Sequence, residues 1–370
     1  MILNSLCAGS FFFLGFILWV KSLQENRIAN RWLAVSLLGI GIMQMDDALI
    51  FSKAYRQFPH YFLLTDLVLF IVPPSLFLAV RHFVNPDKRF YWREALHFIP
   101  LALVFLILIP ELSASPEALA ESIEADLKNR MPGEWAFLIF LPILIQFGVY
   151  LTLSYRKLRR HLKNLELITA TPQASSLKWL QWSLLVLAGM LVVWTFEVRY
   201  YFYEFNAWTT MVYLSGAYVL GYYALRQGEV FPYAPPDLEA ISAIFNPAPG
   251  SGKQIPEANA QLKAGLLELI GEKKIFLDPE LSLPKLARQL GCSTHELSFL
   301  INHSFGKNFY QFINRYRVQE SQRLLLDPQF SHLNILAIGF ESGFNSKTTF
   351  NTAFKNQTGM SPAEFRGKEK

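Results

Sequence analysis

Cysteine is nearly absent from this 370-residue sequence, which limits the chemistry open to it. The two cysteines, Cys7 and Cys292, stand far apart. Two isolated thiols make neither a disulfide framework nor a cysteine-based metal site. His295, His303 and His332 lack ligand spacing with cysteines or carboxylates. We therefore expect no metal site.

A catalytic or cofactor-binding pattern is also missing. No nucleophile is paired with a base, and no glycine-rich loop follows a strand pattern. The segment PGSGK at 249–253 is only superficially like a phosphate-binding loop, because that motif needs glycine where Pro247 stands and serine or threonine where Gln254 stands. We predict that the protein is not an enzyme and uses no cofactor.

Charged residues are scarce, at 17%, whereas 52% of the residues are hydrophobic. That composition is too apolar for a soluble protein, and nearly all of the apolar runs precede Arg226. A helix that crosses a bilayer core needs about 20 mostly apolar residues. Seven such runs are present, at 2–20, 32–50, 61–82, 91–109, 135–155, 180–202 and 208–225. The first lacks the basic start and the cleavage site of a signal peptide, which favours a membrane span.

Lysine and arginine gather in the loops after the first, third and fifth runs, whereas the 111–134 loop is mainly acidic. The positive-inside rule then places the N-terminus outside and the C-terminus in the cytoplasm. The prediction is a multi-pass protein of the bacterial inner (cytoplasmic) membrane.

Five charged residues lie within the predicted spans, toward their outer ends: Asp46, Asp47, Asp66, Glu197 and Arg199. Charges inside a membrane are costly and often mark a functional site. One interpretation is structural, in which the carboxylates reach interfacial water and Glu197 and Arg199 pair with other spans. The other is an outward-facing cup that binds a signal.

Proline and glycine residues between 227 and 256 argue against one continuous helix there. We therefore divide the chain into a seven-span transmembrane domain at 1–226, a cytoplasmic linker at 227–256 and a helical domain at 257–370. The predicted fold class is all-α throughout.

The C-terminal domain contains a first helix-turn-helix pattern. A helix is predicted over 283–290, and Gly291 interrupts it. Ser293 then resembles an N-cap, with Glu296 three residues on to complete a capping box. The helix after it extends to about Asn302. A short helix, a glycine turn and a capped second helix are the parts of a DNA-reading unit.

The pattern then repeats. A helix over 335–342 is followed by a turn at 343–345 and a second helix over 346–355, and a helix over 308–326 joins the two units. The predicted topology places both units in the cytoplasm, where the DNA of a prokaryotic cell lies.

The second unit, GFESGFNSKTTFNTAFKNQTGMSPAEFR at 339–366, closely resembles the AraC/XylS-type DNA-binding domain. The family's Gly-Phe turn, F-x-x-x-F-K helix and G-x-x-P segment occur here in order, and the resemblance covers about the last third of the chain. The first unit is similar through Leu286-Ala287, Leu297-Ser298, Phe305-Gly306, Asn314, Tyr316 and Arg317. One departure is Gly339, where the family usually has alanine; glycine within a helix costs about 1 kcal/mol relative to alanine.

Residues at the N-terminal end of each second helix should face the major groove. In the first unit these are Ser293, Thr294, His295, Glu296 and Ser298; in the second they are Asn345, Ser346, Lys347, Thr348 and Asn351. Lysine suits guanine, asparagine suits adenine and glutamate suits a cytosine amino group. The phosphate-contact candidates are Arg315, Arg317, Arg323 and Lys355.

The sequence thus predicts a membrane-embedded regulator that binds double-stranded DNA as a homodimer and senses a small-molecule or protein signal. Two alternatives stay open. The membrane half could be a transporter or an enzyme regulated by its tail, although the spans show no repeat or broken-helix pair. The tail could instead bind a protein partner, although its polar recognition helices lack the apolar anchors that protein interfaces favour.

Overall fold

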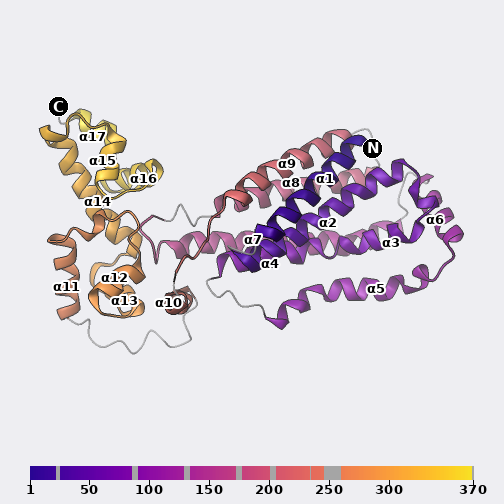
Figure 1. The fold of residues 1–370 in the computed structure, drawn as a ribbon, viewed down its shortest axis with the longest axis horizontal. Coiled ribbons are helices and arrows are strands. Elements are labelled where there is room, and N and C mark those ends of the chain that lie inside the picture. Colours follow the sequence, from indigo (N-terminus) through magenta and orange to yellow (C-terminus); the bar gives the residue numbers. More distant parts are fainter. Residues whose placement is uncertain are drawn as a thin grey trace. The chain divides into compact units, whose positions relative to one another are not determined.

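The structure is a computed structural model, and it describes residues 1–21, 26–85, 91–128, 134–171, 177–200, 206–233, 235–245 and 260–368. Within these ranges every regular element is a helix, and the single strand-like pairing is an antiparallel bridge between Thr169 and Ser282 (Figure 1). The predicted all-α fold class is confirmed for the described residues.

The chain divides into two compact units. The N-terminal unit comprises residues 1–159 and 177–230, and the C-terminal unit comprises 160–176 and 231–370. One boundary lies between Val230 and Phe231. The segment 160–176, a predicted loop between two spans, groups with the C-terminal unit.

The N-terminal unit is a helical bundle. Helix α1 packs along α2 and α9, and α2 packs on α4. The helices are α1 (Ile2–Lys21), α2 (Arg27–Phe51), α3 (Pro59–Val68), α4 (Val72–Val84), α5 (Ile99–Leu112), α6 (Pro116–Lys128), α7 (Glu134–Leu165), α8 (Lys178–Tyr200) and α9 (Asn206–Arg226). The last residues of α7 belong to the C-terminal unit.

Four helical stretches among the described residues are long and apolar enough to cross a membrane, whereas the sequence predicted seven. They are Ile2–Val20, Arg27–Phe51, Trp92–Leu112 and Lys178–Phe196.

The predicted run at 61–82 is not one continuous helix. Helix α3 has 10 residues and ends at Val68, and α4 has 13 residues and begins at Val72. Pro73 and Pro74 stand in the first turn of α4, where proline fits because that turn needs no backbone N–H partner. Because the residues at 61–82 are mostly apolar, hydrophobicity alone does not reveal the break. The local sequence signal for it is the pair of adjacent prolines, Pro73 and Pro74.

The C-terminal unit holds two helix-turn-helix units. The first is α12 (Leu283–Leu290) with α13 (Thr294–Phe305), and the second is α15 (Ile335–Glu341) with α16 (Lys347–Thr358). The joining helix is α14 (Phe309–Leu326). The predicted bounds are confirmed for α12 and α14 to within a residue, while α13 and α16 each extend three residues further. The remaining helices are α10 (Pro235–Phe245), α11 (Ala260–Gly271) and α17 (Pro362–Lys368).

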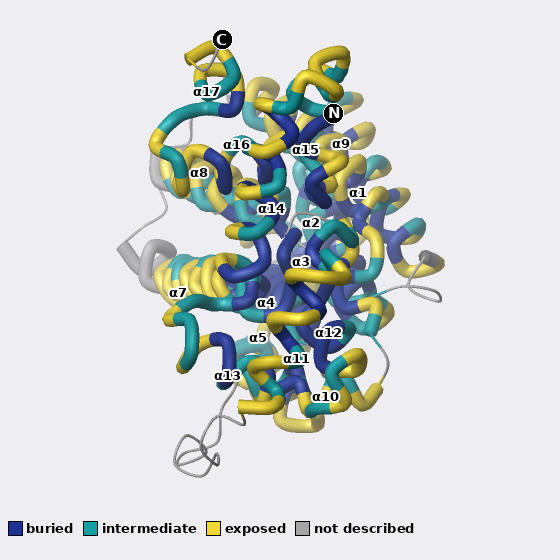
Figure 2. Tube along the Cα trace, turned by 90° about the vertical axis from the view of Figure 1, so that its left-hand side faces the viewer, coloured by how far each residue is buried: buried dark blue, intermediate teal, exposed yellow. Residues whose placement is uncertain are grey.

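Each helix-turn-helix unit has its own hydrophobic core, and α14 contributes to both. Phe312 and Ile313 of α14 belong to the first core, and Val318 and Leu324 belong to the second. Buried stretches of the chain are dark blue in Figure 2. The six residues predicted as core are all buried: Leu297, Leu300, Ile301, Ile338, Phe350 and Phe354. Because α14 is embedded in both cores, it fixes the two helix-turn-helix units relative to each other within the C-terminal unit.

Gly339, the departure from the family pattern, is explained by its neighbour. A Cβ at this position would lie 2.6 Å from Cδ1 of Phe350, a ring buried in the second core. Helix propensity alone predicts that Gly339→Ala stabilises the protein by about 1 kcal/mol. Because overpacking costs about 1 to 3 kcal/mol, we expect the opposite sign.

Pulse proteolysis of the C-terminal unit in the full-length protein measures this change. Gly265→Ala, in α11, is the matched control. A Cβ at Gly265 would meet only the Leu290 side chain, at an ordinary contact distance of 3.5 Å. A stabilised Gly339→Ala protein would contradict the packing argument.

Candidate nucleic-acid interface

The first recognition helix, α13, begins with the predicted capping box. Backbone N–H of Glu296 donates to Oγ of Ser293 at 3.1 Å, and backbone N–H of Ser293 donates to Oε2 of Glu296 at 2.8 Å. The hydrogen bonds that the Glu296 carboxylate accepts from backbone N–H and Oγ of Ser293 lower the pKa of Glu296 below its ordinary value. Gly291 ends α12 with φ +67°, the left-handed conformation that glycine adopts without strain. The capping box is confirmed, and it holds the Glu296 carboxylate against the backbone.

The second recognition helix, α16, is capped in a similar way. Oγ of Ser346 accepts a hydrogen bond from backbone N–H of Thr349 at 3.2 Å. Asn334 caps the preceding helix, α15, through its Oδ1, which accepts from Ala337 N–H at 2.8 Å. Side-chain caps of this kind satisfy N–H groups that have no partner within the helix.

Most of the predicted base-contact residues are accessible. Ser293, His295, Glu296, Asn345, Lys347 and Thr348 are exposed, and Ser298, Ser346 and Asn351 are half-buried. Thr294 is the exception, because it is 6% exposed and is counted among the buried residues of α13. The prediction of a base contact is wrong for Thr294, whose side chain is covered by the domain itself.

The predicted phosphate-contact residues divide into two kinds. Arg315 and Lys355 are exposed. Arg323 is exposed as well, but its Nη2 donates to Oε1 of Glu320 at 2.8 Å. Arg317 is 0% exposed, so it cannot reach a phosphate, and the prediction is wrong for this residue.

Arg317 instead holds the C-terminal unit together. Its Nε donates to the Phe276 carbonyl and its Nη2 to the Asp278 carbonyl, both at 2.7 Å. Its guanidinium lies over the ring of Phe344, 5.7 Å from the centroid. Burial lowers the pKa of Arg317 to about 10. One side chain thus ties α14 to the loop before α12 and to the turn of the second helix-turn-helix unit.

Gly343 brings that turn against the same loop. Its φ is +88°, and a Cβ would lie 2.5 Å from the Phe276 carbonyl oxygen and 2.7 Å from Cα of Leu277. The sequence marked Gly343 as a turn residue, but the approach of a distant backbone segment came only from the structure. Arg317 and Gly343 therefore meet the same stretch of backbone, at the end of a short 3-10 helix (Ile275–Leu277), which we call the 276–278 loop.

The charged residues predicted as a signal site are placed only in part. Asp46 and Asp47 both line a cavity of about 970 Å³ within the N-terminal unit. The side chains of Asp66, Glu197 and Arg199 lie outside the described residues. The structure therefore brings two of the five predicted residues to one site.

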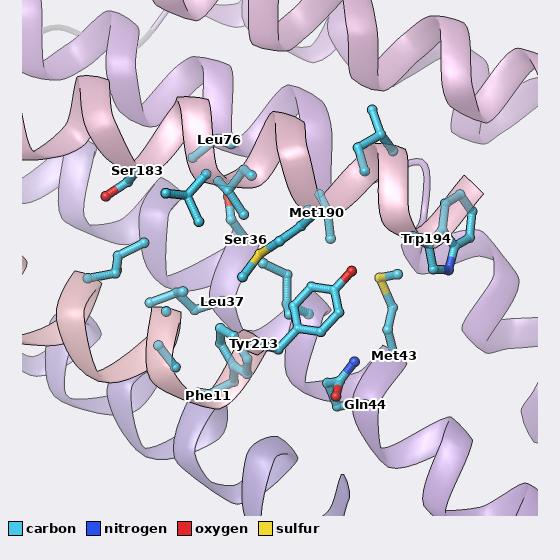
Figure 3. Close-up of a pocket in the computed structure, with 18 of the residues that line it drawn as sticks. Phe11, Ser36, Leu37, Met43, Gln44, Leu76, Ser183, Met190, Trp194 and Tyr213 are labelled. Atoms are coloured by element: carbon cyan, nitrogen blue, oxygen red, sulfur yellow. The ribbon is translucent and has the colours of Figure 1, made fainter. Parts of the chain in front are cut away.

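The cavity is mainly apolar and is lined by residues of α1, α2, α3, α4, α7, α8 and α9. Figure 3 draws Gln44, Tyr213, Met43 and Trp194 among the residues that line it. Gln44 is 8% exposed, and its Oε1 has no hydrogen-bond partner among the described residues. The sequence analysis did not single out Gln44. The available signal was a polar amide within an apolar run, three residues before Asp47.

Comparisons with known proteins agree with this geometry. A family model described as "Helix-turn-helix domain" matches residues 286–368. An "Uncharacterized HTH-type transcriptional regulator" of Staphylococcus aureus is 32% identical over 94 residues, which are 25% of this chain and 12% of that protein. The "Msm operon regulatory protein" of Streptococcus mutans is 30% identical over 129 residues, 34% of this chain and 44% of that protein. The chain thus matches less than half the length of these relatives.

No solved structure matches the chain. Residues 286–368 are nevertheless established as a helix-turn-helix domain of the kind found in proteins named as transcriptional regulators.

Proposed function

We propose that this protein is a sequence-specific DNA-binding regulator of transcription, of the AraC/XylS type, embedded in the bacterial inner membrane with its C-terminal unit in the cytoplasm. The observation that carries the proposal is the pair of capped recognition helices, α13 and α16, with polar side chains exposed at their N-terminal ends. The proposed partners are double-stranded DNA, the lipid bilayer and a second copy of the chain.

The joining helix supports the reading of two DNA segments at once. Helix α14 has 18 residues, so it is roughly 27 Å long at 1.5 Å per residue. One turn of B-DNA is about 34 Å, the spacing of successive major-groove segments on one face. A rigid helix of this length, embedded in both cores, can hold two recognition helices at neighbouring groove segments.

Genome-wide crosslinking of the full-length protein to DNA tests this function. We expect discrete peaks that disappear in a Lys347→Ala, Asn351→Ala double variant, because each base contact contributes about 1 to 3 kcal/mol of discrimination. The matched control is Lys368→Ala with Asn356→Ala, the same residue types at exposed positions away from the start of α16. Absence of peaks for every version would favour the transporter or protein-partner alternative.

Membrane embedding is supported by surface composition. Helix α5 buries none of its residues, and Ile107 is 72% exposed and Leu106 60% exposed. A contiguous apolar surface of this kind is unfavourable in water and suits acyl chains. The four candidate spans and the alternating basic loops point to the same environment.

Signal sensing is the second function that we propose for the N-terminal unit, and the cavity favours it. An apolar chamber with two carboxylates and a buried amide suits an amphipathic cation, since the charge would lie near Asp46 and Asp47 and the body against apolar walls. Trp182 and Trp194 line the cavity, so their fluorescence reports occupancy.

Tetraphenylphosphonium is a suitable probe, and tetraphenylborate is its control of similar shape and opposite charge. In nanodiscs holding the full-length protein, the cation should quench tryptophan fluorescence saturably. The double variant Asp46→Asn, Asp47→Asn should bind the cation about tenfold more weakly, a loss of ~1.4 kcal/mol of binding free energy. Equal binding of cation and anion, unchanged in the double variant, would rule out this ligand class.

A further inference from the structure

The segment directly after α7 lies within the C-terminal unit, although about 60 residues separate it from Phe231, where that unit resumes. The sequence alone predicts a basic loop between two spans here. Ile168 and Ala170 are each 1% exposed or less, so the segment is embedded in this unit. We call residues 166–171 the docked segment.

The docked segment lies at the start of α12. Backbone N–H of Leu283, the first residue of α12, donates to the carbonyl of Ile168 at 2.8 Å. Thr169 forms the antiparallel bridge with Ser282, and Oγ1 of Thr171 donates to the Pro279 carbonyl at 3.2 Å. The first N–H groups of a helix have no hydrogen-bond partner within the helix. Here the docked segment supplies a carbonyl acceptor for one of them.

The same segment also meets the start of α14. Backbone N–H of Tyr310 donates to the Glu166 carbonyl at 3.0 Å, and Nδ2 of Asn308 donates to Oε2 of Glu166 at 3.3 Å. Asn308 is the N-cap of α14. A carbonyl and a carboxylate at a helix N-terminus are favourable, because that end carries a partial positive charge.

Ala170 connects the docked segment to the residues that join the two helix-turn-helix units. Ala170 is 0% exposed and belongs to the first hydrophobic core. Its carbonyl accepts from Nδ2 of Asn314 at 3.0 Å, and Oδ1 of Asn314 accepts from Nη1 of Arg317 at 3.5 Å. These two hydrogen bonds connect Ala170 to Arg317 through Asn314. Arg317 also donates to the 276–278 loop, so the buried chain of hydrogen bonds continues from Ala170 to that loop.

We infer that the docked segment is an integral part of the DNA-binding domain and positions its two helix-turn-helix units through Asn314 and Arg317. Helix α7 is continuous with this segment, so it is the element by which the N-terminal unit acts on DNA binding. The contacts of the segment involve none of the exposed recognition residues, so the docked segment leaves those residues open to DNA. This inference rests on the proposed DNA-binding function.

Operator binding by the full-length protein in nanodiscs gives the first test. Ala170→Asp places a carboxylate in the first core and should weaken binding at least tenfold. Ala363→Asp is the matched control, an exposed alanine in α17 of the same unit, and it should bind like the wild type. Equal affinity of Ala170→Asp and wild type would overturn the inference.

A crosslink keeps the test informative if Ala170→Asp fails to fold. Thr169→Cys with Ser282→Cys, in a chain whose Cys7 and Cys292 are serine, should form a disulfide on mild oxidation, because bridged residues lie within disulfide reach. A protease site inserted at 251–253 then shows whether the two pieces stay joined, and each single-cysteine variant is a control.

The crosslinked protein should bind its operator within about threefold of the reduced protein. Pieces that separate under oxidising conditions, or a crosslink that abolishes binding, would overturn the inference. If the wild type itself binds no DNA, the proposed function fails, while the crosslink still reports whether the segment is docked. The two failures are therefore distinguishable.

Discussion

Replacing Arg317 with alanine should abolish operator binding by destabilising the C-terminal unit rather than by removing a phosphate contact. Arg317 is fully buried and donates to the carbonyls of Phe276 and Asp278. Its loss leaves the Phe276 carbonyl without this donor and opens a cavity beside Phe344, whereas the Asp278 carbonyl still accepts from backbone N–H of Leu281 at 3.2 Å. A hydrogen bond to a charged group contributes about 1.5 to 3 kcal/mol, so losing two of them removes a large share of a domain's stability.

Arg317→Lys should recover little of this stability. Lysine presents a compact ammonium on a flexible stem, whereas the two carbonyls are held by the planar fork of a guanidinium. Pulse proteolysis of the C-terminal unit measures the stability of both variants in the full-length protein.

Arg315→Ala is the matched control, because Arg315 is exposed on the same helix. It should leave protease resistance unchanged and reduce the salt dependence of operator binding by about one unit of slope, as expected for one lost phosphate contact. A stable Arg317→Ala protein with only this reduced salt slope would restore the phosphate-contact role that the sequence suggested.

Gly343→Ala should be the most damaging glycine-to-alanine change among the described residues. A left-handed φ costs alanine about 1 kcal/mol by itself, and the added Cβ would lie 2.5 Å from the Phe276 oxygen and 2.7 Å from Cα of Leu277. Those atoms are backbone, so they cannot move as a side-chain tip does. We expect a loss of at least about 3 kcal/mol and separation of the second helix-turn-helix unit from the 276–278 loop.

Gly359→Ala isolates the conformational part of this cost. Gly359 has φ +78°, and nothing lies within 4 Å of the position that a Cβ would take there. Its substitution should therefore cost about 1 kcal/mol. The comparison is made by chemical denaturation of the two variants side by side, and equal destabilisation would show that the close approach at Gly343 is unimportant.

The two helix-turn-helix units can be recognised in the sequence, because their signals are local. Ser293 and Glu296, three residues apart, form a capping box. Gly291 adopts the left-handed conformation that ends α12. Hydrophobic periodicity likewise identified buried residues such as Leu297 and Phe350. Each of these features depends on residues within a turn or two of one another, so a linear reading reaches them.

Only the tertiary structure decided what distant residues do to one another. Arg317 and Arg315 stand two positions apart on one helix, yet one is buried under the 276–278 loop and the other faces solvent. Gly339 is required by the ring of Phe350, and the docked segment reaches α12 and α14 across more than 100 residues. Burial and hydrogen bonding between remote segments depend on the packed arrangement of the chain, and neither composition nor spacing encodes that arrangement directly.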